Sequence, residues 1–257
     1  MENKMPLSVA VITKNEEQNI RECLRSVAFA SDIVVVDSGS TDATTAIAAE
    51  AGCRVFVEDW KGYGPQKNSA LEKCRFDWTL IVDADERIPE ATAREIERCL
   101  QYDRGFSAFS FRRKNFFHGK WMKRCGWWPD ETVRLVRRSQ GRMLGLTHEK
   151  WGTRGRTGKL SAHIDHYSFG NYDDMLGIMR SRAAGMAREL FDSGRRIGPA
   201  TPVLHGLGMF LKAFVFRLGF LAGFDGLVIS LTTAGVSFFK YANLLELQRM
   251  DARGRPR

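Results

Sequence analysis

The sequence predicts an α/β protein whose central sheet is mostly parallel. Short apolar, β-branched runs alternate with helical patterns through the first hundred residues, and these runs are apolar almost throughout. Continuous apolar strands are typical of a sheet covered by helices on both faces, and strand–helix alternation is typical of parallel connections. In such sheets, ligands bind beyond the carboxyl ends of the strands.

The first hundred residues are expected to contain four strands and four helices. The strands are runs rich in Val and Ile, and the helices repeat apolar residues every three or four positions. Asp42 is suited to cap a helix, and Pro89 stands where a first helical turn tolerates proline. In chain order we expect strand Leu7–Thr13, helix Glu16–Val27, strand Ile33–Asp37, helix Asp42–Ala51, strand Arg54–Glu58, helix Gln66–Lys73, strand Trp78–Asp83 and helix Pro89–Gln101.

The pattern changes after residue 105. Phe106–Arg113 and Thr132–Arg138 alternate apolar and basic residues as half-buried strands do, and the irregular aromatic segment Asn115–Trp128 lies between them. Asp173–Asp192 has the spacing of an amphipathic helix, and Pro202–Leu247 is apolar and rich in glycine. We therefore expect a catalytic or binding domain over residues 1–170 and a helical region over residues 171–257.

Hydrophobic content, net charge and cysteine spacing indicate what kind of protein this is. The chain has 257 residues, 44% of them hydrophobic, which is ordinary for a globular protein with a sizeable core. Its net charge of +9 implies an acidic partner such as a nucleotide, a nucleic acid or an anionic membrane. The five cysteines are scattered and contain no Cys-x-x-Cys pair, which favours reduced thiols over a disulfide framework or a zinc site.

Asp83-Ala84-Asp85 follows the apolar run Trp78–Val82. Two carboxylates at a strand end are unfavourable unless a positive group joins them, and Mg²⁺ typically binds one or two carboxylates together with substrate phosphates. The two side chains point the same way only if the backbone stays extended through Ala84. The alternative is a polar strand end followed by the start of a helix.

Polar residues also follow the other expected strands. They occupy positions 13–17 after the first strand and 37–42 after the second, and a flexible loop at 62–68 carries Lys67. Helix starts favour anionic groups, so Lys67 adds positive charge where phosphates would bind. Glu16 and Asp42 also fit simple roles as helix-start residues. Neither a Gly-x-Gly-x-x-Gly fingerprint nor a P-loop follows the first strand.

The combination resembles the nucleotide-binding half of glycosyltransferase family 2, whose members are inverting enzymes with the GT-A fold. The resemblance rests on Val11–Glu17, Val35–Asp42 and Val82–Asp85, and extends more loosely to Trp128–Leu135 and His148-Glu149. The later segments resemble the subgroup that includes lipopolysaccharide core glucosyltransferases. Where the family often has an aromatic residue after the first strand, this chain has Lys14.

The resemblance implies roles for particular residues. Asp37 would accept a hydrogen bond from the base, and Asp85 would hold Mg²⁺ or Mn²⁺ with help from His148. The remaining nucleotide-binding residues would be Thr13, Glu17, Lys67 and Asp83.

Inverting transfer also requires a base for the acceptor hydroxyl, and Asp130 is the candidate. Between residues 104 and 142 the chain carries eleven Lys and Arg but only two acids, Asp130 and Glu131. Of these two acids, the resemblance favours Asp130 as the base. The alternative is simple ion pairing with Arg134 or Arg138.

The C-terminal part predicts association with a membrane surface. Residues 209–221 and 226–239 are apolar but interrupted, and nearby cations favour anionic lipid. The alternative is a helical hairpin buried against the catalytic domain. The C-terminal helices would place the protein on the cytoplasmic face of the inner membrane.

The leading interpretation is a metal-dependent glycosyltransferase that moves glucose from a UDP-linked donor to a membrane glycolipid, the inner core of lipopolysaccharide. A second interpretation replaces the acceptor with a polyprenyl phosphate, which is already anionic and needs no base. A third is a nucleic-acid-binding module that uses the basic aromatic segment. Acidic strand ends would repel nucleic-acid phosphates, so we do not expect nucleic acid as a partner.

Overall fold

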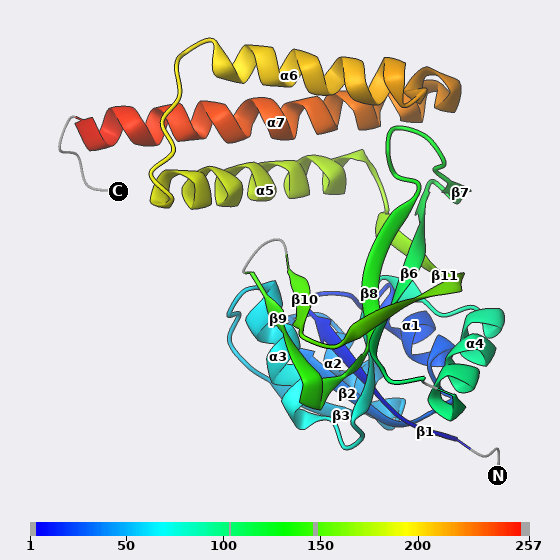
Figure 1. Ribbon diagram of the computed structural model, residues 1–257. Helices are drawn as coiled ribbons and strands as arrows, with labels where there is room; N and C mark the ends of the chain where they lie inside the picture. Colours follow the sequence, from blue (N-terminus) through cyan, green and yellow to red (C-terminus); the bar gives the residue numbers. More distant parts are fainter. Residues whose placement is uncertain (1–3, 103, 146–148, 253–257) are drawn as a thin grey trace. The chain divides into compact units, whose positions relative to one another are not determined.

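The computed structural model describes residues 4–102, 104–145 and 149–252 (Figure 1). The chain divides into two compact units. The first contains Met1–Lys114 and Pro129–Ser168, and the second contains Asn115–Trp128 and Phe169–Arg257. The division at residue 168 lies beside the expected boundary at 170, and segment 115–128 groups with the second unit.

Within the described residues, nine strands form one sheet, and eight of them follow the order β3-β2-β1-β4-β8-β6-β11-β5, with β7 paired to β6. Strands β3, β2, β1 and β4 are mutually parallel, which confirms the predicted parallel core, and antiparallel strands extend it through β8. The strands are β1 (Met5–Thr13), β2 (Ala30–Asp37), β3 (Arg54–Val57), β4 (Trp78–Asp83), β5 (Glu86–Arg87), β6 (Phe106–Phe117), β7 (Lys120–Trp121), β8 (Asp130–Arg137) and β11 (Arg156–Phe169).

Two antiparallel strands, β9 (Gly141–Leu144) and β10 (Lys150–Thr153), form a separate ribbon after a 3₁₀ turn, η1 (Arg138–Gln140). Strand β8 begins two residues before the expected Thr132, because Asp130 and Glu131 pair with Arg113 and Arg112 of β6. The candidate base therefore lies on a strand, and its backbone position is fixed by sheet pairing.

The helices of the first unit are α1 (Ile20–Ser26), α2 (Thr44–Glu50), α3 (Tyr63–Lys73) and α4 (Glu90–Gln101). Helix α1 begins four residues later than expected, because residues 17–19 form turns before it. Helix α3 begins three residues earlier than expected. Asp42 does hydrogen-bond the start of α2, since its Oδ1 accepts from the backbone N–H of Thr44 at 3.0 Å.

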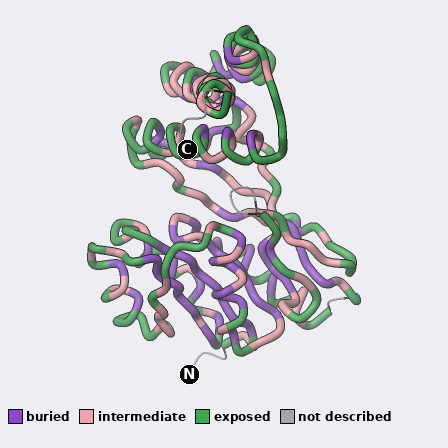
Figure 2. Tube along the Cα trace, turned by 90° about the vertical axis from the view of Figure 1, so that its left-hand side faces the viewer, coloured by how far each residue is buried: buried purple, intermediate pink, exposed green. Residues whose placement is uncertain are grey.

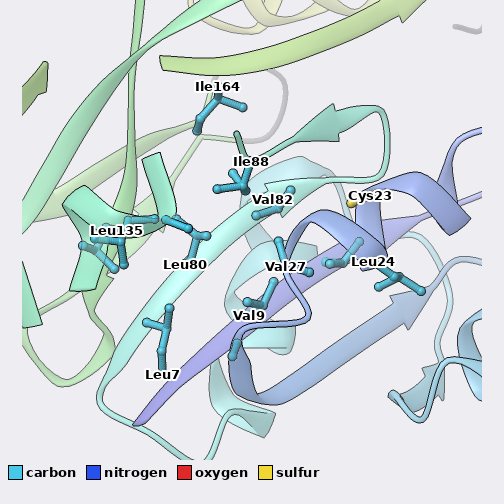
Figure 3. Packing of buried hydrophobic residues seen from close by; sticks show 14 of the residues in the cluster. Leu7, Val9, Cys23, Leu24, Val27, Leu80, Val82, Ile88, Leu135 and Ile164 are labelled. Carbon is cyan, nitrogen blue, oxygen red and sulfur yellow. The ribbon is translucent and has the colours of Figure 1, made fainter. Parts of the chain in front are cut away.

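The core lies on both faces of the sheet because alternate residues of a strand point to opposite sides. Leu7 and Val9 of β1 pack with Leu24 of α1 on one face, whereas Ala10 and Ile12 pack with residues of α3 on the other. Figure 3 shows the first cluster, with Leu80 and Val82 of β4 beside the β1 residues. Figure 2 shows that buried residues follow the strands of this unit.

The second unit is helical. It contains α5 (Tyr172–Asp192), α6 (Thr201–Leu211), a π-helical turn η2 (Lys212–Phe216), a 3₁₀ turn η3 (Gly219–Ala222) and α7 (Gly223–Ala252). Helix α7 packs against both α5 and α6 (Figure 1). The η3 turn approaches α7 so closely that a Cβ on Gly226 would lie 2.0 Å from the carbonyl oxygen of Gly219.

The aromatic segment 115–128 is anchored within this second unit. The Asn115 side chain donates to the carbonyl of Trp127 at 2.9 Å, and the N–H of Cys125 donates to the carbonyl of Arg217 at 3.1 Å. His118 Nδ1 lies 3.1 Å from Asp225 Oδ1, which also accepts from the Tyr172 hydroxyl at 2.7 Å. The segment predicted to be irregular is therefore held by specific polar contacts.

The packing predicts where the first unit is sensitive to substitution. Leu80 is fully buried in β4, so Leu80→Ala should lower the free energy of unfolding by about 2–5 kcal/mol through lost burial and the cavity left behind. Val57→Ala is the matched control because Val57 is 68% exposed, and it should change stability by less than about 0.5 kcal/mol. Urea denaturation followed by tryptophan fluorescence would measure both. Equal effects of the two substitutions would contradict this account of the core.

Candidate active site

The carboxyl ends of β1, β2 and β4 meet at one edge of the sheet. The parallel register pairs Thr13 with Asp37 and Ile12 with Asp83, so the loops after these strands begin side by side. This is the edge where parallel α/β sheets bind ligands. Three of the residues singled out in the sequence therefore lie in neighbouring strands.

Asp37 organises the loop after β2. Its Oδ2 accepts from the backbone N–H groups of Gly39 at 2.9 Å and Ser40 at 2.8 Å, and its Oδ1 accepts from the Ser40 hydroxyl. Gly39 has a φ of +79°, a left-handed conformation that glycine adopts without strain. Asp37 is 1% exposed, so its carboxylate is buried and largely used within its own loop.

The loops after β1 and β2 are cross-linked. Asn15 Oδ1 accepts from the N–H of Thr41 at 2.8 Å, and Glu17 Oε2 accepts from the N–H of Ala43 at 3.1 Å. The hydroxyls of Thr13 and Ser38, at the ends of the same two strands, are buried and have no hydrogen-bond partner among the described residues.

Asp83 is held between two cations. Its Oδ1 lies 2.8 Å from Lys67 Nζ, and its Oδ2 accepts from the guanidinium of Arg134. Burial alone would raise the pKa of Asp83, but the charges of Arg134 and Lys67 outweigh it and hold the pKa well below its usual range. Both cations are themselves buried, with Lys67 at 1% and Arg134 at 2% exposure.

Asp85 has a different environment because the strand ends at Asp83 and residues 84–85 form a turn. The two carboxylates therefore do not share the extended geometry considered from the sequence. Asp85 Oδ2 lies 3.3 Å from His166 Nε2 on β11. Burial opposes ionisation of Asp85, but the neighbouring His166 outweighs it, so the pKa of Asp85 lies below its ordinary value.

Asp130 is held by Arg113, whose Nε donates to Asp130 Oδ2 at 3.0 Å, with a second guanidinium nitrogen at 2.9 Å. The same guanidinium lies 3.3 Å from Glu86 Oε1. Glu149 lies 2.6 Å from Lys67, which it shares with Asp83. His148, the predicted second metal ligand, lies outside the described residues.

Within the described part of the chain, no three His, Cys, Asp or Glu side chains lie close enough together to hold a metal ion by themselves. Among the described residues, one linked network joins three cations, on Lys67, Arg113 and Arg134, to four carboxylates, on Asp83, Glu86, Asp130 and Glu149.

The structure thus brings together Lys67, Asp83, Asp85 and, through Arg113, Asp130. Thr13 and Asp37 end the neighbouring strands β1 and β2, and Glu17 lies in the turn after β1. No role in the site was predicted for Glu86, Arg113 or His166, and Arg134 was considered only as an ion-pair partner of Asp130, whereas Arg113 pairs with Asp130 and Arg134 pairs with Asp83 and Glu86. An acid in a strand that follows Asp-x-Asp was a usable signal for Glu86, whereas the arginines looked like the exposed face of basic strands.

Comparisons with known proteins agree with this fold. The model of the family "Glycosyl transferase family 2" matches residues 8–155. An uncharacterized glycosyltransferase of Rickettsia typhi is 30% identical over 94% of this chain and 87% of its own length. The lipopolysaccharide core biosynthesis glycosyltransferase LpsC of Rhizobium meliloti is 28% identical over 97% of this chain and 96% of its own.

Among solved structures, residues 1–349 of TarS from S. aureus superimpose with a TM-score of 0.50 and 17% identity. The alignment covers 98% of this chain and 92% of that one. At this identity the likeness concerns the fold, and it confirms the predicted GT-A class.

Proposed function

The chain belongs to glycosyl transferase family 2, and we propose that it is an inverting, metal-dependent enzyme that transfers glucose from a UDP-linked donor to a membrane glycolipid. One observation carries the proposal. An acidic turn, a buried lysine and a separately anchored carboxylate, Asp130, converge at one edge of a parallel sheet. LpsC, a relative over nearly the whole chain, is a lipopolysaccharide core biosynthesis glycosyltransferase, which supports a lipopolysaccharide core acceptor, and we propose the inner core.

The donor nucleotide would occupy the loops after β1 and β2. Thr13 and Asp37, paired at the ends of β1 and β2, would lie beside the nucleoside. Asp37 Oδ1 accepts only from Ser40 among the described residues, so it retains capacity for a base N–H. Glu17 would act indirectly, by holding the two loops together.

The donor set near Asp85 fits a divalent cation. Asp85 Oδ2 and His166 Nε2 are a carboxylate oxygen and an imidazole nitrogen 3.3 Å apart, and diphosphate oxygens would complete the coordination of Mg²⁺ or Mn²⁺. Asp83 is less suited to direct ligation because both of its oxygens already pair with cations. Such a cation, when bound, stabilises negative charge on the departing diphosphate.

The protein's own residues would perform the remaining steps. Asp130 accepts the proton of the acceptor hydroxyl as that oxygen bonds to the anomeric carbon from the face opposite the diphosphate. The bond between the anomeric carbon and the diphosphate oxygen breaks in the same step, and UDP leaves with the bonding electrons. Lys67, oriented by Asp83 and Glu149, would offset the charge that develops on UDP.

The second unit would bind the cytoplasmic surface of the inner membrane. The stretch Gly219–Ala252 is long and apolar enough to cross a membrane, and only 28% of its most apolar window is buried. Lys212, Arg217 and Lys240 lie within the same apolar region and would favour anionic lipid headgroups. Exposed large apolar side chains of this unit include Val203, Leu204, Leu207, Leu211, Val215, Phe216, Phe220, Leu221, Phe224, Leu231 and Phe239.

The donor and metal assignments can be tested together by measuring hydrolysis of several nucleotide sugars with Mg²⁺, Mn²⁺ or EDTA. UDP-glucose should turn over fastest. EDTA should lower turnover by about 100-fold or more, because Lewis-acid stabilisation contributes several kcal/mol. Asp85→Asn should weaken activation by Mn²⁺, whereas Asp59→Asn, on the exposed loop after β3, should not. Full activity in EDTA would reject the metal role.

The role of Asp130 is tested by Asp130→Asn, which keeps the shape of the side chain but removes its basicity. Turnover should fall by about 10²- to 10⁴-fold, the usual contribution of a general base, while the Kd for UDP stays within about threefold. Calorimetry with UDP would measure the Kd, and an assay with purified lipopolysaccharide acceptor would measure turnover. Normal turnover would favour an acceptor that is already anionic, such as a polyprenyl phosphate.

The membrane assignment predicts that Leu204→Asp with Phe216→Asp will release the protein from anionic vesicles. These side chains are 67% and 78% exposed, so the change should leave the fold intact. Losing two buried apolar side chains from the lipid should weaken partitioning by about 100-fold. Val57→Asp in the first unit is the control. Sedimentation with phosphatidylglycerol vesicles that is unchanged in the double variant would contradict the assignment.

A further inference from the structure

Glu86 is a carboxylate with no access to solvent. It lies on the two-residue strand β5, which pairs with β11 so that Glu86 stands opposite His166. Its exposure is 0%, so the side chain cannot touch a substrate directly. A fully buried acid is unfavourable unless its charge is paired and its oxygens accept hydrogen bonds. Both oxygens of Glu86 have such partners.

The two oxygens of Glu86 reach three separate parts of the site. Oε1 lies 2.6 Å from a nitrogen of Arg134 and 3.3 Å from a nitrogen of Arg113. Oε2 accepts from the backbone N–H of Asp83 at 3.0 Å. One carboxylate therefore contacts the last residue of β4, the guanidinium that holds the Asp83 side chain, and the guanidinium that holds Asp130.

These contacts connect the residues proposed to bind the donor with the residue proposed as the base. On one side, Arg134 binds the Asp83 carboxylate, which in turn contacts Lys67. On the other side, Arg113 forms two close contacts with Asp130. Glu86 is the group that these two branches share, and the guanidinium groups would repel each other without its charge between them.

We propose that Glu86 is a positioning residue for the transfer step, which sets Asp130 against the donor side of the site through Arg113 and Arg134. The inference rests on the proposed role of Asp130 as the base. A base must lie within hydrogen-bond reach of the proton that it removes, and misplacement by about 1 Å can reduce turnover by about 100-fold. Glu86, which has no solvent access, thus controls the turnover rate through the position of Asp130.

The alternative is that Glu86 only stabilises the fold by neutralising Arg134. Asp32 provides the matched control. It is also a buried carboxylate, at 4% exposure, and it binds the Arg54 guanidinium at 2.9 and 3.1 Å and the N–H of Arg75 at 2.9 Å. It lies near the amino end of β2, so Asp32→Asn should lower stability while leaving turnover per folded molecule unchanged.

The test compares Glu86→Gln, Glu86→Asp and Asp32→Asn in the full-length protein. Glu86→Gln should lower kcat by about 100-fold, while KM for the donor and the Kd for UDP change by less than about threefold. Glu86→Asp keeps the charge but shortens the side chain, and it should recover part of the lost kcat. Parallel losses of kcat and UDP affinity, or kcat within threefold of wild type, would overturn the proposal.

The double variant Glu86→Gln/Asp130→Asn separates positioning from general destabilisation. If Glu86 acts through Asp130, the double variant should be no slower than Asp130→Asn alone, because residues that act as a unit are not additive. Full additivity would overturn the proposal. If Glu86→Gln does not fold, Glu86→Asp takes its place in the same cycle, because it keeps the charge but withdraws the carboxylate from Arg113 and Arg134.

The outcomes also separate this inference from the proposed function. A fully active Asp130→Asn variant would remove the base assignment and this inference together. An inactive Asp130→Asn variant beside a fully active Glu86→Gln variant would leave the proposed function standing and reject only the positioning role.

Discussion

The organisation of the candidate site depends on burying charge at the carboxyl edge of the sheet. Lys67, Glu86 and Arg134 are each at most 2% exposed, and removing an ion from water costs several kcal/mol unless partners compensate. Each of these groups therefore requires opposite charge at contact distance: Lys67 has Asp83 and Glu149, and Arg134 has Asp83 and Glu86. The requirement fixes side chains from α3, β4, β5 and β8 relative to one another, and Arg113 carries the same constraint to Asp130 on β8.

The backbone makes this arrangement possible by ending β4 at Asp83. The turn at residues 84–85 separates two carboxylates that an extended strand would have placed side by side. Asp83 faces Lys67 and Arg134, whereas Asp85 faces His166. A short sequence motif thus supplies two chemically distinct groups, one neutralised by fixed cations and one beside an imidazole.

The parallel part of the fold could be predicted from sequence because its signals are local. The apolar runs ending at Thr13, Asp37 and Asp83 marked both the strands and their functional edge. The partners of Asp83 and Asp85 could not be found in this way, because Arg134 and His166 arrive through strand pairings with residues about 50 and 80 positions away. Basic residues that alternate with apolar ones indicate a solvent-facing strand, and nothing local distinguishes Arg134, which is buried, from its neighbours.

The charge balance of the edge bears on how a donor would bind. The three cations of the network, on Lys67, Arg113 and Arg134, already contact four carboxylates, on Asp83, Glu86, Asp130 and Glu149. A nucleoside diphosphate adds further negative charge, so on the proposed function it binds favourably only together with a cation that offsets this charge. Lys67 would offset only part of this charge, because it already contacts two carboxylates, and Arg134 and Arg113 are committed to Asp83, Glu86 and Asp130. The network that orders the site is therefore also the reason that metal and donor should bind cooperatively.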